Sequence, residues 1–216
     1  MLRLIKKYLS YLIVIPEYRF DSIHSGKMDI RWENGRLALN SSNANYSFNK
    51  LHKVLQKGLR NVDLTILADQ PILNLGLAAG SSVDIVRNEI GIDNRIDSVE
   101  IDPSILSTVR TYFGIDGYKS HQIFLIDAWD YLSEFNDQYG LVIIDLFIDR
   151  TVDSRFLSHE FFELLEQNLS PKGQVMFNFI GNSPHPFIQH LGKQHEYLVE
   201  SVKDNLVLIY RRTDVS

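Results

Sequence analysis

Acidic and small side chains follow four successive apolar runs in the middle of the chain. The positions are residues 76–80 after the first run, Glu100 and Asp102 after the second, Asp127 and Ala128 after the third, and Asp145 after the fourth. A loop of small residues lets the backbone come close to a ligand, and a carboxylate at the next strand end accepts hydrogen bonds from ribose hydroxyls. Gly76 and Glu100 are 24 positions apart, close to the spacing of about 20 that such a pair shows. The pattern predicts a site for the adenosine part of a nucleotide-like cofactor.

Each of these signals also has a purely structural explanation. Gly80 could be a plain helix-entry glycine, Asp102 precedes Pro103 and could cap a helix, and Asp127 could cap the helix that begins near Trp129. For any one residue the two explanations are about equally good. Ligands of open parallel sheets lie beyond the carboxyl ends of the strands. Four signals at four successive strand ends therefore favour a binding site.

The elements that would hold these side chains alternate between strands and helices. Predicted strands cover residues 72–75, 96–101, 123–126, 141–145 and 174–179, and helical patterns such as 82–90 separate them. Runs such as LVII and IFLI are apolar on both faces, which is typical of parallel strands covered by helices on two sides. Two further runs, 196–202 and 206–211, predict an antiparallel edge. The predicted fold class is α/β, a Rossmann-like parallel sheet that ends in an antiparallel C-terminal hairpin.

The first sixty residues follow a different pattern. Short alternating runs at 27–32 and 37–39 flank Asn34-Gly35, which predicts a hairpin with a type I′ turn. Apolar residues at helical spacing then predict a helix over about 48–59. We expect residues 1–60 to form a hairpin and helix extension, and residues 61–216 to form the main domain.

An apolar run at residues 8–15 follows several basic residues near the N-terminus. The run is interrupted by Ser10 and precedes no small-x-small cleavage site. It is also far shorter than the roughly 20 residues that cross a bilayer. We expect a helix or strand that packs its apolar side onto the domain, in a cytoplasmic protein without a membrane partner.

Composition restricts the classes of function. The chain has 216 residues and a net charge of -5, with acids and bases interspersed, which speaks against a nucleic-acid partner. It has no cysteine, which excludes disulfides, thiolate metal sites and a cysteine nucleophile. His185, His190 and His195 are spaced by five, so no two share a helical face and we expect no metal site.

Five segments resemble the spermidine synthase family, in the order NLGLAAGSS, VEID, IDAWDYL, YGLVIIDLF and LSPKGQVMFN. This family is a branch of the class I S-adenosylmethionine-dependent methyltransferase fold, and the resemblance extends from about Pro71 to Asn178. It implies group transfer from S-adenosylmethionine or decarboxylated S-adenosylmethionine, with aminopropyl transfer to a polyamine as the family's activity. The expected partners are a small-molecule donor and acceptor, and a homodimer is left open.

By position, the resemblance assigns three kinds of role. Asp145 would be the catalytic residue, the acid nearest the sulfonium and the acceptor. Donor contacts would come from Gly76, Ala78 and Gly80 in the loop, from Glu100 and Ile101 at the ribose, and from Asp127 and Ala128 at the adenine. Acceptor contacts would come from Tyr46, Phe147 and Asp149. Trp129 and Phe147 could sandwich an adenine or an acceptor, although aromatic residues at such positions more often belong to the core.

Two motifs depart from the family pattern. In the family this loop is usually richer in glycine and contains an aspartate. In this chain the loop has Ala78 and Ala79 and no acidic residue. The catalytic stretch is typically an aspartate, two small hydroxyl residues and a second aspartate, whereas this chain has Asp145-Leu-Phe-Ile-Asp149. An aminopropyl donor would need an anion for its free amine, so a loop without an acid favours the carboxylated donor.

The chemistry allows several activities. Transfer from a sulfonium is an in-line displacement that depends on positioning, and Asp145 could orient an amine and take its proton. A dicationic acceptor would need a second anion, for which Asp149, Asp153 and Glu160 are candidates, although solvated surface charges explain them equally well. The alternatives are methyl transfer to an undetermined acceptor and a non-catalytic adenosine-binding domain. A nicotinamide oxidoreductase is disfavoured because G-x-G-x-x-G is missing and the C-terminal hairpin is antiparallel.

Overall fold

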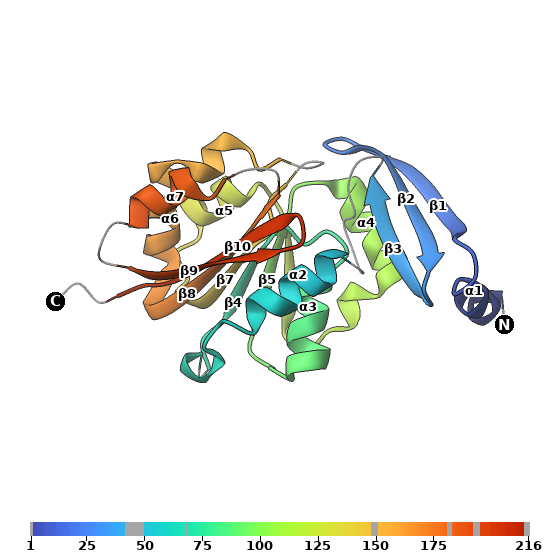
Figure 1. Cartoon of the computed structure of the whole chain (residues 1–216), viewed down its shortest axis with the longest axis horizontal. Coiled ribbons are helices and arrows are strands. Elements are labelled where there is room, and N and C mark those ends of the chain that lie inside the picture. Colours follow the sequence, from blue (N-terminus) through green and yellow to red (C-terminus); the bar gives the residue numbers. More distant parts are fainter. Residues whose placement is uncertain are drawn as a thin grey trace.

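The computed structural model describes residues 2–41, 50–67, 69–147, 151–180, 183–191 and 195–213. It contains a small antiparallel sheet and a large sheet flanked by helices (Figure 1). The small sheet consists of β1 (Ile15–Ser22), β2 (Gly26–Glu33) and β3 (Arg36–Ser41). The large sheet consists of β4 (Ile72–Leu75), β5 (Ile96–Glu100), β6 (His121–Leu125), β7 (Tyr139–Ile144), β8 (Leu169–Ile180), β9 (Glu196–Val202) and β10 (Asn205–Arg211). The helices are α1 (Leu2–Leu9), α2 (Lys50–Leu59), α3 (Ser81–Asp84), α4 (Pro103–Phe113), α5 (Ala128–Glu134), α6 (His159–Asn168) and α7 (His185–Leu191).

The large sheet has the strand order β6-β5-β4-β7-β8-β10-β9. Strands β4 to β8 run parallel to one another, and β10 lies between β8 and β9 and is antiparallel to both. This arrangement confirms the predicted Rossmann-like sheet with an antiparallel C-terminal hairpin. Short connections make β9 and β10 a hairpin, whereas each parallel pair needs a crossover helix.

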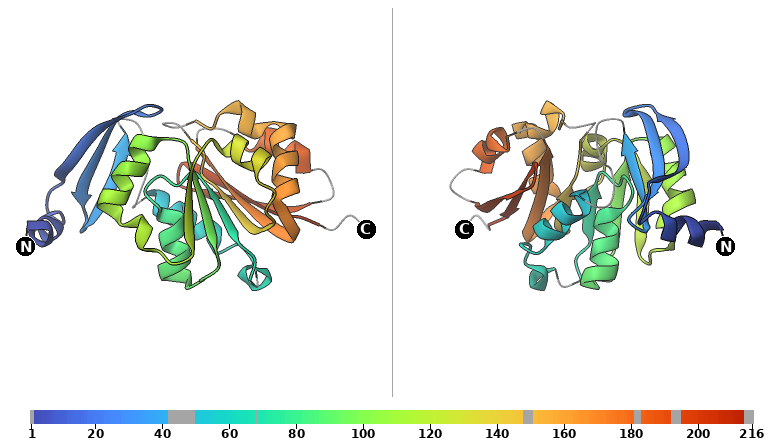
Figure 2. Two further views of the ribbon diagram at one scale, coloured as in Figure 1. Left: turned by 180° about the vertical axis from the view of Figure 1, so that it is seen from behind. Right: turned by 45° about the vertical axis from the view of Figure 1, so that its right-hand side comes forward.

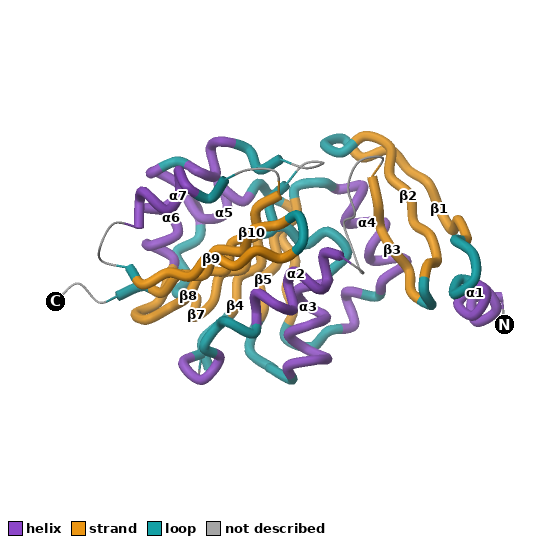
Figure 3. The backbone as a smooth tube through the Cα atoms, viewed as in Figure 1, coloured by secondary structure: helices purple, strands orange, loops and turns teal. Residues whose placement is uncertain are grey.

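Two hydrophobic cores cover the two faces of the large sheet. Figures 2 and 3 show helices on both sides of this sheet. Side chains alternate between faces along each strand, so Leu141 and Ile143 of β7 join one core and Val142 and Ile144 join the other. Helices α2, α3 and α4 pack on the first face, and α5, α6 and α7 pack on the second. Burial on both sides explains why the strand runs are continuously apolar.

Some boundaries differ from the sequence predictions. Strand β6 begins at His121, two residues before the predicted start, because an edge strand tolerates polar side chains such as His121 and Gln122. Strand β8 begins at Leu169, earlier than predicted, and pairs with β7 through an irregular register near its start. The predicted helix over 82–90 begins one residue earlier as α3 and continues over Ile85–Ile90 as a π-helix.

The small sheet contains the predicted hairpin and one strand that sequence patterns did not indicate. Asn34 and Gly35 both have positive φ, at 50° and 77°, as a type I′ turn requires. Strand β1 precedes this hairpin and pairs antiparallel with β2. The small sheet meets the rest of the molecule through α4, on which β1 packs with Tyr18 stacked on Tyr112 at 5.4 Å between ring centroids.

The N-terminal expectation was wrong in one respect. Helix α1 forms where an apolar helix or strand was expected, but it buries none of its residues. Its apolar side chains face solvent because Lys6 contacts Glu17 of β1 and Arg3 contacts the backbone oxygen of Tyr112 in α4. No helix among the described residues is long and apolar enough to span a membrane.

The predicted helix over 48–59 corresponds to α2, and residues 42–49 lie outside the described part of the chain. Helix α2 packs against α3 and against β8 and β10 of the large sheet. The division of the chain at residue 60 remains a prediction.

Candidate functional site

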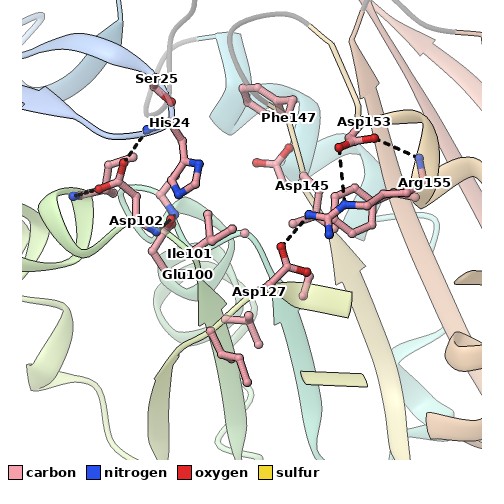
Figure 4. A pocket seen from close by; sticks show the side chains of 18 residues that line it. His24, Ser25, Glu100, Ile101, Asp102, Asp127, Asp145, Phe147, Asp153 and Arg155 are labelled. Carbon is pink, nitrogen blue, oxygen red and sulfur yellow. Dashed lines mark hydrogen bonds and ion pairs between the residues drawn. The ribbon is translucent and has the colours of Figure 1, made fainter. Parts of the chain in front are cut away.

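A pocket opens beyond the carboxyl ends of β4, β5 and β7, and the β1–β2 turn of the small sheet forms part of its rim (Figure 4). The residues that line it are His24, Ser25, Gly76, Ala78, Val99, Glu100, Ile101, Asp102, Ile105, Ile126, Asp127, Ala128, Asp145, Leu146, Phe147, Asp153, Arg155 and Phe156. Strand ends that are separate in sequence thus meet at one edge of the sheet, where open parallel sheets bind their ligands.

The loop after β4 brings two strand ends together. Gly76 has a φ of 90°, and a Cβ atom there would lie 2.4 Å from the backbone oxygen of Asp145. Only glycine fits this close approach, so Gly76 lets β4 and β7 end side by side at the pocket. Ala78 also lines the pocket, whereas Gly80 lies outside the lining residues as the N-cap of α3.

Glu100 forms a fixed hydrogen-bond acceptor in the lining of the pocket. One carboxylate oxygen accepts a hydrogen bond from the backbone N–H of Ala78 at 3.0 Å, and the other accepts one from Asp102 at 3.0 Å. Burial raises the pKa of Glu100, and these two N–H groups oppose the rise. The neighbouring Ile101 is 39% exposed and lines the pocket, an unusual exposure for a large apolar side chain at a strand end.

Asp102 has the structural role that its sequence position suggested. Its carboxylate accepts hydrogen bonds from the backbone N–H groups of Ser104 and Ile105, so it caps α4. The same carboxylate accepts hydrogen bonds from the Ser22 hydroxyl and the His24 backbone N–H. Burial alone would raise the pKa of Asp102, but these hydrogen bonds outweigh burial and hold the pKa below its usual value. Asp102 therefore connects the start of α4, at the rim of the pocket, to Ser22 and His24 of the small sheet by hydrogen bonds.

Asp127 lines the pocket and also caps a helix. Its Oδ1 accepts a hydrogen bond from the Trp129 backbone N–H at 2.8 Å, which begins α5. Its Oδ2 lies 2.6 Å from Nη2 of Arg155, and Arg155 also pairs with Asp153, with 3.5 Å between Nε and Oδ2. Figure 4 shows this acid–arginine–acid group on the side of the pocket opposite His24.

Asp145 is the first residue after β7 and lies at the back of the pocket (Figure 4). Its Oδ1 accepts a hydrogen bond from the Asn178 amide at 2.7 Å. Burial raises the pKa of Asp145 to about 7, and the hydrogen bond from Asn178 limits the rise. A carboxyl group with such a pKa exchanges a proton near neutral pH.

The other sequence-predicted residues fall in three places. Phe147 lines the pocket, whereas Tyr46 and Asp149 lie outside the described residues. Trp129 stacks on Phe161 in the core that covers the second sheet face, with ring centroids 6.0 Å apart. Of the two described candidates for a second anion, Asp153 lines the pocket and Glu160 is an exposed residue of α6 outside the lining.

Sequence reasoning missed four polar groups at or behind the pocket. His24 and Ser25 come from the β1–β2 turn, Arg155 comes from a short 3₁₀ turn before α6, and Asn178 comes from β8. Only Asn178 had a sequence signal, since a polar residue inside a buried strand needs a partner. The others lie in turns, whose position depends on the assembled fold.

Away from the pocket, the described residues contain a group with metal-ligand spacing. Ligand atoms of His52, Asp84 and Glu89 lie within 4.8 Å of one another. His52 Nε2 lies 2.6 Å from a Glu89 oxygen, and Asp84 accepts a hydrogen bond from the Tyr118 hydroxyl. Hydrogen bonds account for the contacts within this group, and the expected lack of a metal remains a prediction.

Comparisons with known proteins agree with this architecture. The family model of the spermine/spermidine synthase domain matches residues 80–200. The human eEF1A lysine and N-terminal methyltransferase is 26% identical over 150 residues, which cover 60% of this chain and 20% of that protein. The chain thus spans about a fifth of the length of this curated relative.

Two solved structures show the same fold at low sequence identity. A probable spermidine synthase from Corynebacterium glutamicum superposes with a TM-score of 0.73 and 16% identity, covering 92% of this chain and 80% of that one. Human methyltransferase-like protein 13 in complex with SAH superposes with a TM-score of 0.62 and 19% identity, covering 78% and 84%. At these identities the likeness establishes the fold.

Proposed function

The chain belongs to the spermine/spermidine synthase domain family, a branch of the S-adenosylmethionine-dependent transferase superfamily, and from this premise we propose that it transfers a methyl group from S-adenosylmethionine to an amine. The observation that carries the proposal is Asp145, an enclosed carboxyl group with a pKa of about 7 at the back of the pocket. An amine attacks a sulfonium only as the free base, so it must lose a proton. Asp145 is the residue that takes it.

The donor would lie along the strand ends. Glu100 would accept hydrogen bonds from the ribose hydroxyls, since its carboxylate is fixed by two backbone N–H groups. The adenine would lie against Ile101 and Ala128, near Asp127. The sulfonium would then be close to Asp145, where its positive charge favours the ionised carboxylate. The reaction needs in-line positioning of amine, methyl carbon and sulfur, which the pocket walls would have to provide.

Methyl transfer is favoured over aminopropyl transfer by the loop after β4. Gly76 and Ala78 are the loop residues in the pocket lining, and neither offers an anion to the free amine of a decarboxylated donor. The similarity to a protein described as a lysine and N-terminal methyltransferase also supports an amine acceptor.

Aminopropyl transfer is the second candidate, and the charge of the pocket favours it. Five carboxyl groups line the pocket, from Glu100, Asp102, Asp127, Asp145 and Asp153, against the single arginine Arg155. A polyamine would be attracted to such a pocket. Asp127 and Asp102 are already engaged by Arg155 and by hydrogen bonds, which leaves fewer anions for the acceptor.

Calorimetric titration separates these candidates. We expect S-adenosylmethionine and S-adenosylhomocysteine to bind and NAD not to bind, with decarboxylated S-adenosylmethionine as the competitor. Binding of NAD without any adenosyl sulfur compound would refute the transferase proposal, and a strong preference for the decarboxylated donor would refute methyl transfer. Mass spectrometry with putrescine, spermidine and lysine-containing peptides then identifies the transferred group. Donor binding without turnover on any amine would indicate a non-catalytic domain.

A further inference from the structure

Arg155 is the only lysine or arginine among the described residues that line the pocket. It lies in the 3₁₀ turn Ser154–Leu157 before α6, on the same wall of the pocket as Asp127 and Asp153 (Figure 4). Its guanidinium group bridges the two acids, with 2.6 Å from Nη2 to Oδ2 of Asp127 and 3.5 Å from Nε to Oδ2 of Asp153. The two carboxylates therefore share one cation that the chain itself supplies.

Further contacts hold this cation in place. Oδ1 of Asp153 accepts a hydrogen bond from the backbone N–H of Arg155 at 3.1 Å, so the acid that pairs with the guanidinium also caps the turn that carries it. The guanidinium carbon lies 4.5 Å from the ring centroid of the buried Phe156, which is a cation–π contact. On the other side, Asp127 is fixed because its Oδ1 caps α5. The bridge between the two acids is therefore a built part of the pocket wall.

The other three acids of the pocket have partners elsewhere in the chain. Glu100 accepts hydrogen bonds from two backbone N–H groups. Asp102 caps α4 and also accepts hydrogen bonds from the small sheet. Asp145 accepts a hydrogen bond from the Asn178 amide, and burial raises its pKa to about 7, so part of it is uncharged near neutral pH. With the pair beside Arg155, each of the five acids in the described lining has a partner within the chain.

A diamine in this pocket would have to place a second ammonium group. Asp127 and Asp153 are the acids left for it, because backbone N–H groups hold the two acids at the end of β5 and Asp145 serves the reacting amine. An ammonium group beside the guanidinium would bring two like charges into contact, which is strongly unfavourable. The ammonium must therefore displace Arg155, which is attached to the chain and competes at an effective concentration of roughly millimolar order. A diamine at lower concentration loses this competition, whereas an amine with one charge does not enter it.

From this geometry we propose that Arg155 is a specificity-determining residue that excludes diamines and polyamines from the pocket and admits an amine with a single positive charge. The inference rests on the proposed transfer to an amine, and it specifies the class of that amine. It also explains how a pocket with five carboxyl groups serves an acceptor other than a polyamine. The internal cation neutralises the wall at which the far end of a dication would bind, while Asp145 remains outside this ion-paired group.

Isothermal titration calorimetry of the full chain with putrescine and n-butylamine tests the inference. The two amines have the same carbon chain and differ in the second ammonium group. We expect the wild type to bind both weakly, and we expect Arg155→Gln to bind putrescine at least about tenfold more tightly than the wild type does, because two acids lose their internal cation. The gain for n-butylamine should be smaller, because it has only one charge to place. Added salt should reduce the gain, since the side chain of Asp153 is half exposed.

Three variants separate charge at the pocket wall from other effects. Arg110→Gln removes one positive charge from an exposed ion pair with Asp116 outside the pocket lining, and it should leave putrescine affinity unchanged. Arg155→Lys keeps a cation at the wall and should bind putrescine as weakly as the wild type does. Asp153→Asn added to Arg155→Gln should reverse most of the gain, and asparagine preserves the cap of the turn. Thermal unfolding and near-UV circular dichroism show that each variant is folded.

Several outcomes would overturn the inference. A wild-type chain that binds putrescine at least about tenfold more tightly than n-butylamine refutes it without any variant. An Arg155→Gln variant with the putrescine affinity of the wild type also refutes it, and Arg155 then only ties its turn to α5. Equal gains from Arg155→Gln and Arg110→Gln would assign the effect to net charge. The titrations are made with and without S-adenosylhomocysteine, so a chain that binds no adenosyl sulfur compound refutes the proposed function while the exclusion of putrescine is still measured.

Discussion

The side-chain amide of Asn178 lies between Asp145 and Asn205. Its nitrogen donates to Oδ1 of Asp145 at 2.7 Å, and its oxygen accepts from the amide nitrogen of Asn205 at 2.8 Å. Asn205 thereby determines which end of the Asn178 amide faces Asp145. Asn178 is fully buried on β8, and Asn205 begins β10, so the antiparallel hairpin supports the residue to which we assign the proton transfer.

Replacing Asp145 tests the catalytic assignment directly. Asp145→Asn keeps size and shape but removes the basicity, so donor binding should persist. Turnover with an amine should fall by roughly 10² to 10⁴, the usual contribution of a positioned acid or base. Calorimetry and steady-state kinetics measure the two effects. If turnover per folded molecule stays within a few fold of the wild type, Asp145 has only a structural role.

Removing the amide behind Asp145 should shift the pH dependence of the reaction. Asn178→Leu takes away the hydrogen bond that lowers the pKa of Asp145, so the pKa should rise further above 7. The rate should then increase with pH over a higher range than in the wild type. The measurement is kcat/KM for the donor as a function of pH, and Asn205→Ala should give a smaller shift in the same direction because it frees the amide to turn.

A matched control for Asn178 exists on the same strand. Gln174 of β8 is also buried, and its amide exchanges two hydrogen bonds of 2.9 Å with the backbone of Asp63. Gln174→Leu should lower stability without moving the pH profile. Equal shifts from Asn178→Leu and Gln174→Leu would mean that general loosening of β8, and not the hydrogen bond to Asp145, sets the profile.

The raised pKa of Asp145 also predicts how stability depends on pH. The group has a pKa of about 7 in the folded protein and about 3.9 in the unfolded chain. Its contribution to stability is complete below about pH 4 and is lost as the pH rises through about 7, since the folded protein disfavours the charged form. Because asparagine does not titrate, the free energy of unfolding of the wild type minus that of Asp145→Asn should fall by about 2 to 4 kcal/mol over this range. Urea unfolding at several pH values provides the measurement, and a constant difference would contradict the assigned pKa.

Glu100 should contribute to donor affinity through its charge. Glu100→Gln preserves the shape, but it removes the charge and places an amide donor against the N–H groups of Ala78 and Asp102. The affinity for S-adenosylhomocysteine should drop by the roughly 1.5 to 3 kcal/mol that a charged hydrogen bond contributes. Asp97→Asn on the same strand is the control, because Asp97 is buried against Tyr139, outside the pocket lining. It should change the melting temperature and leave donor affinity as it was.

The parts of the fold that local patterns control were predictable from the sequence. The strand runs ending at Leu75, Glu100 and Ile144 are short and separated by helical patterns, so the parallel sheet follows from them. Asp145 follows its strand directly, and a side chain at the end of a parallel strand must emerge at the ligand edge. For this reason the positions of Glu100, Asp127 and Asp145 in one pocket could be expected before the structure was known.

Only the tertiary structure determines the hydrogen-bond and ion-pair partners of these residues. Ser22 and Asp102 are 80 positions apart and Asp145 and Asn178 are 33 apart, and no periodicity in the chain connects such pairs. The sequence likewise did not determine the orientation of α1. An amphipathic pattern indicates that a helix has a polar and an apolar side, but it does not indicate which side faces the protein. Lys6 can pair with Glu17, and Arg3 can donate to the backbone oxygen of Tyr112, only once the small sheet and α4 are in place. Local periodicity thus determined the strands and their acidic ends, whereas long-range hydrogen bonds and ion pairs determined the electrostatics of the pocket and the exposure of the apolar side of α1.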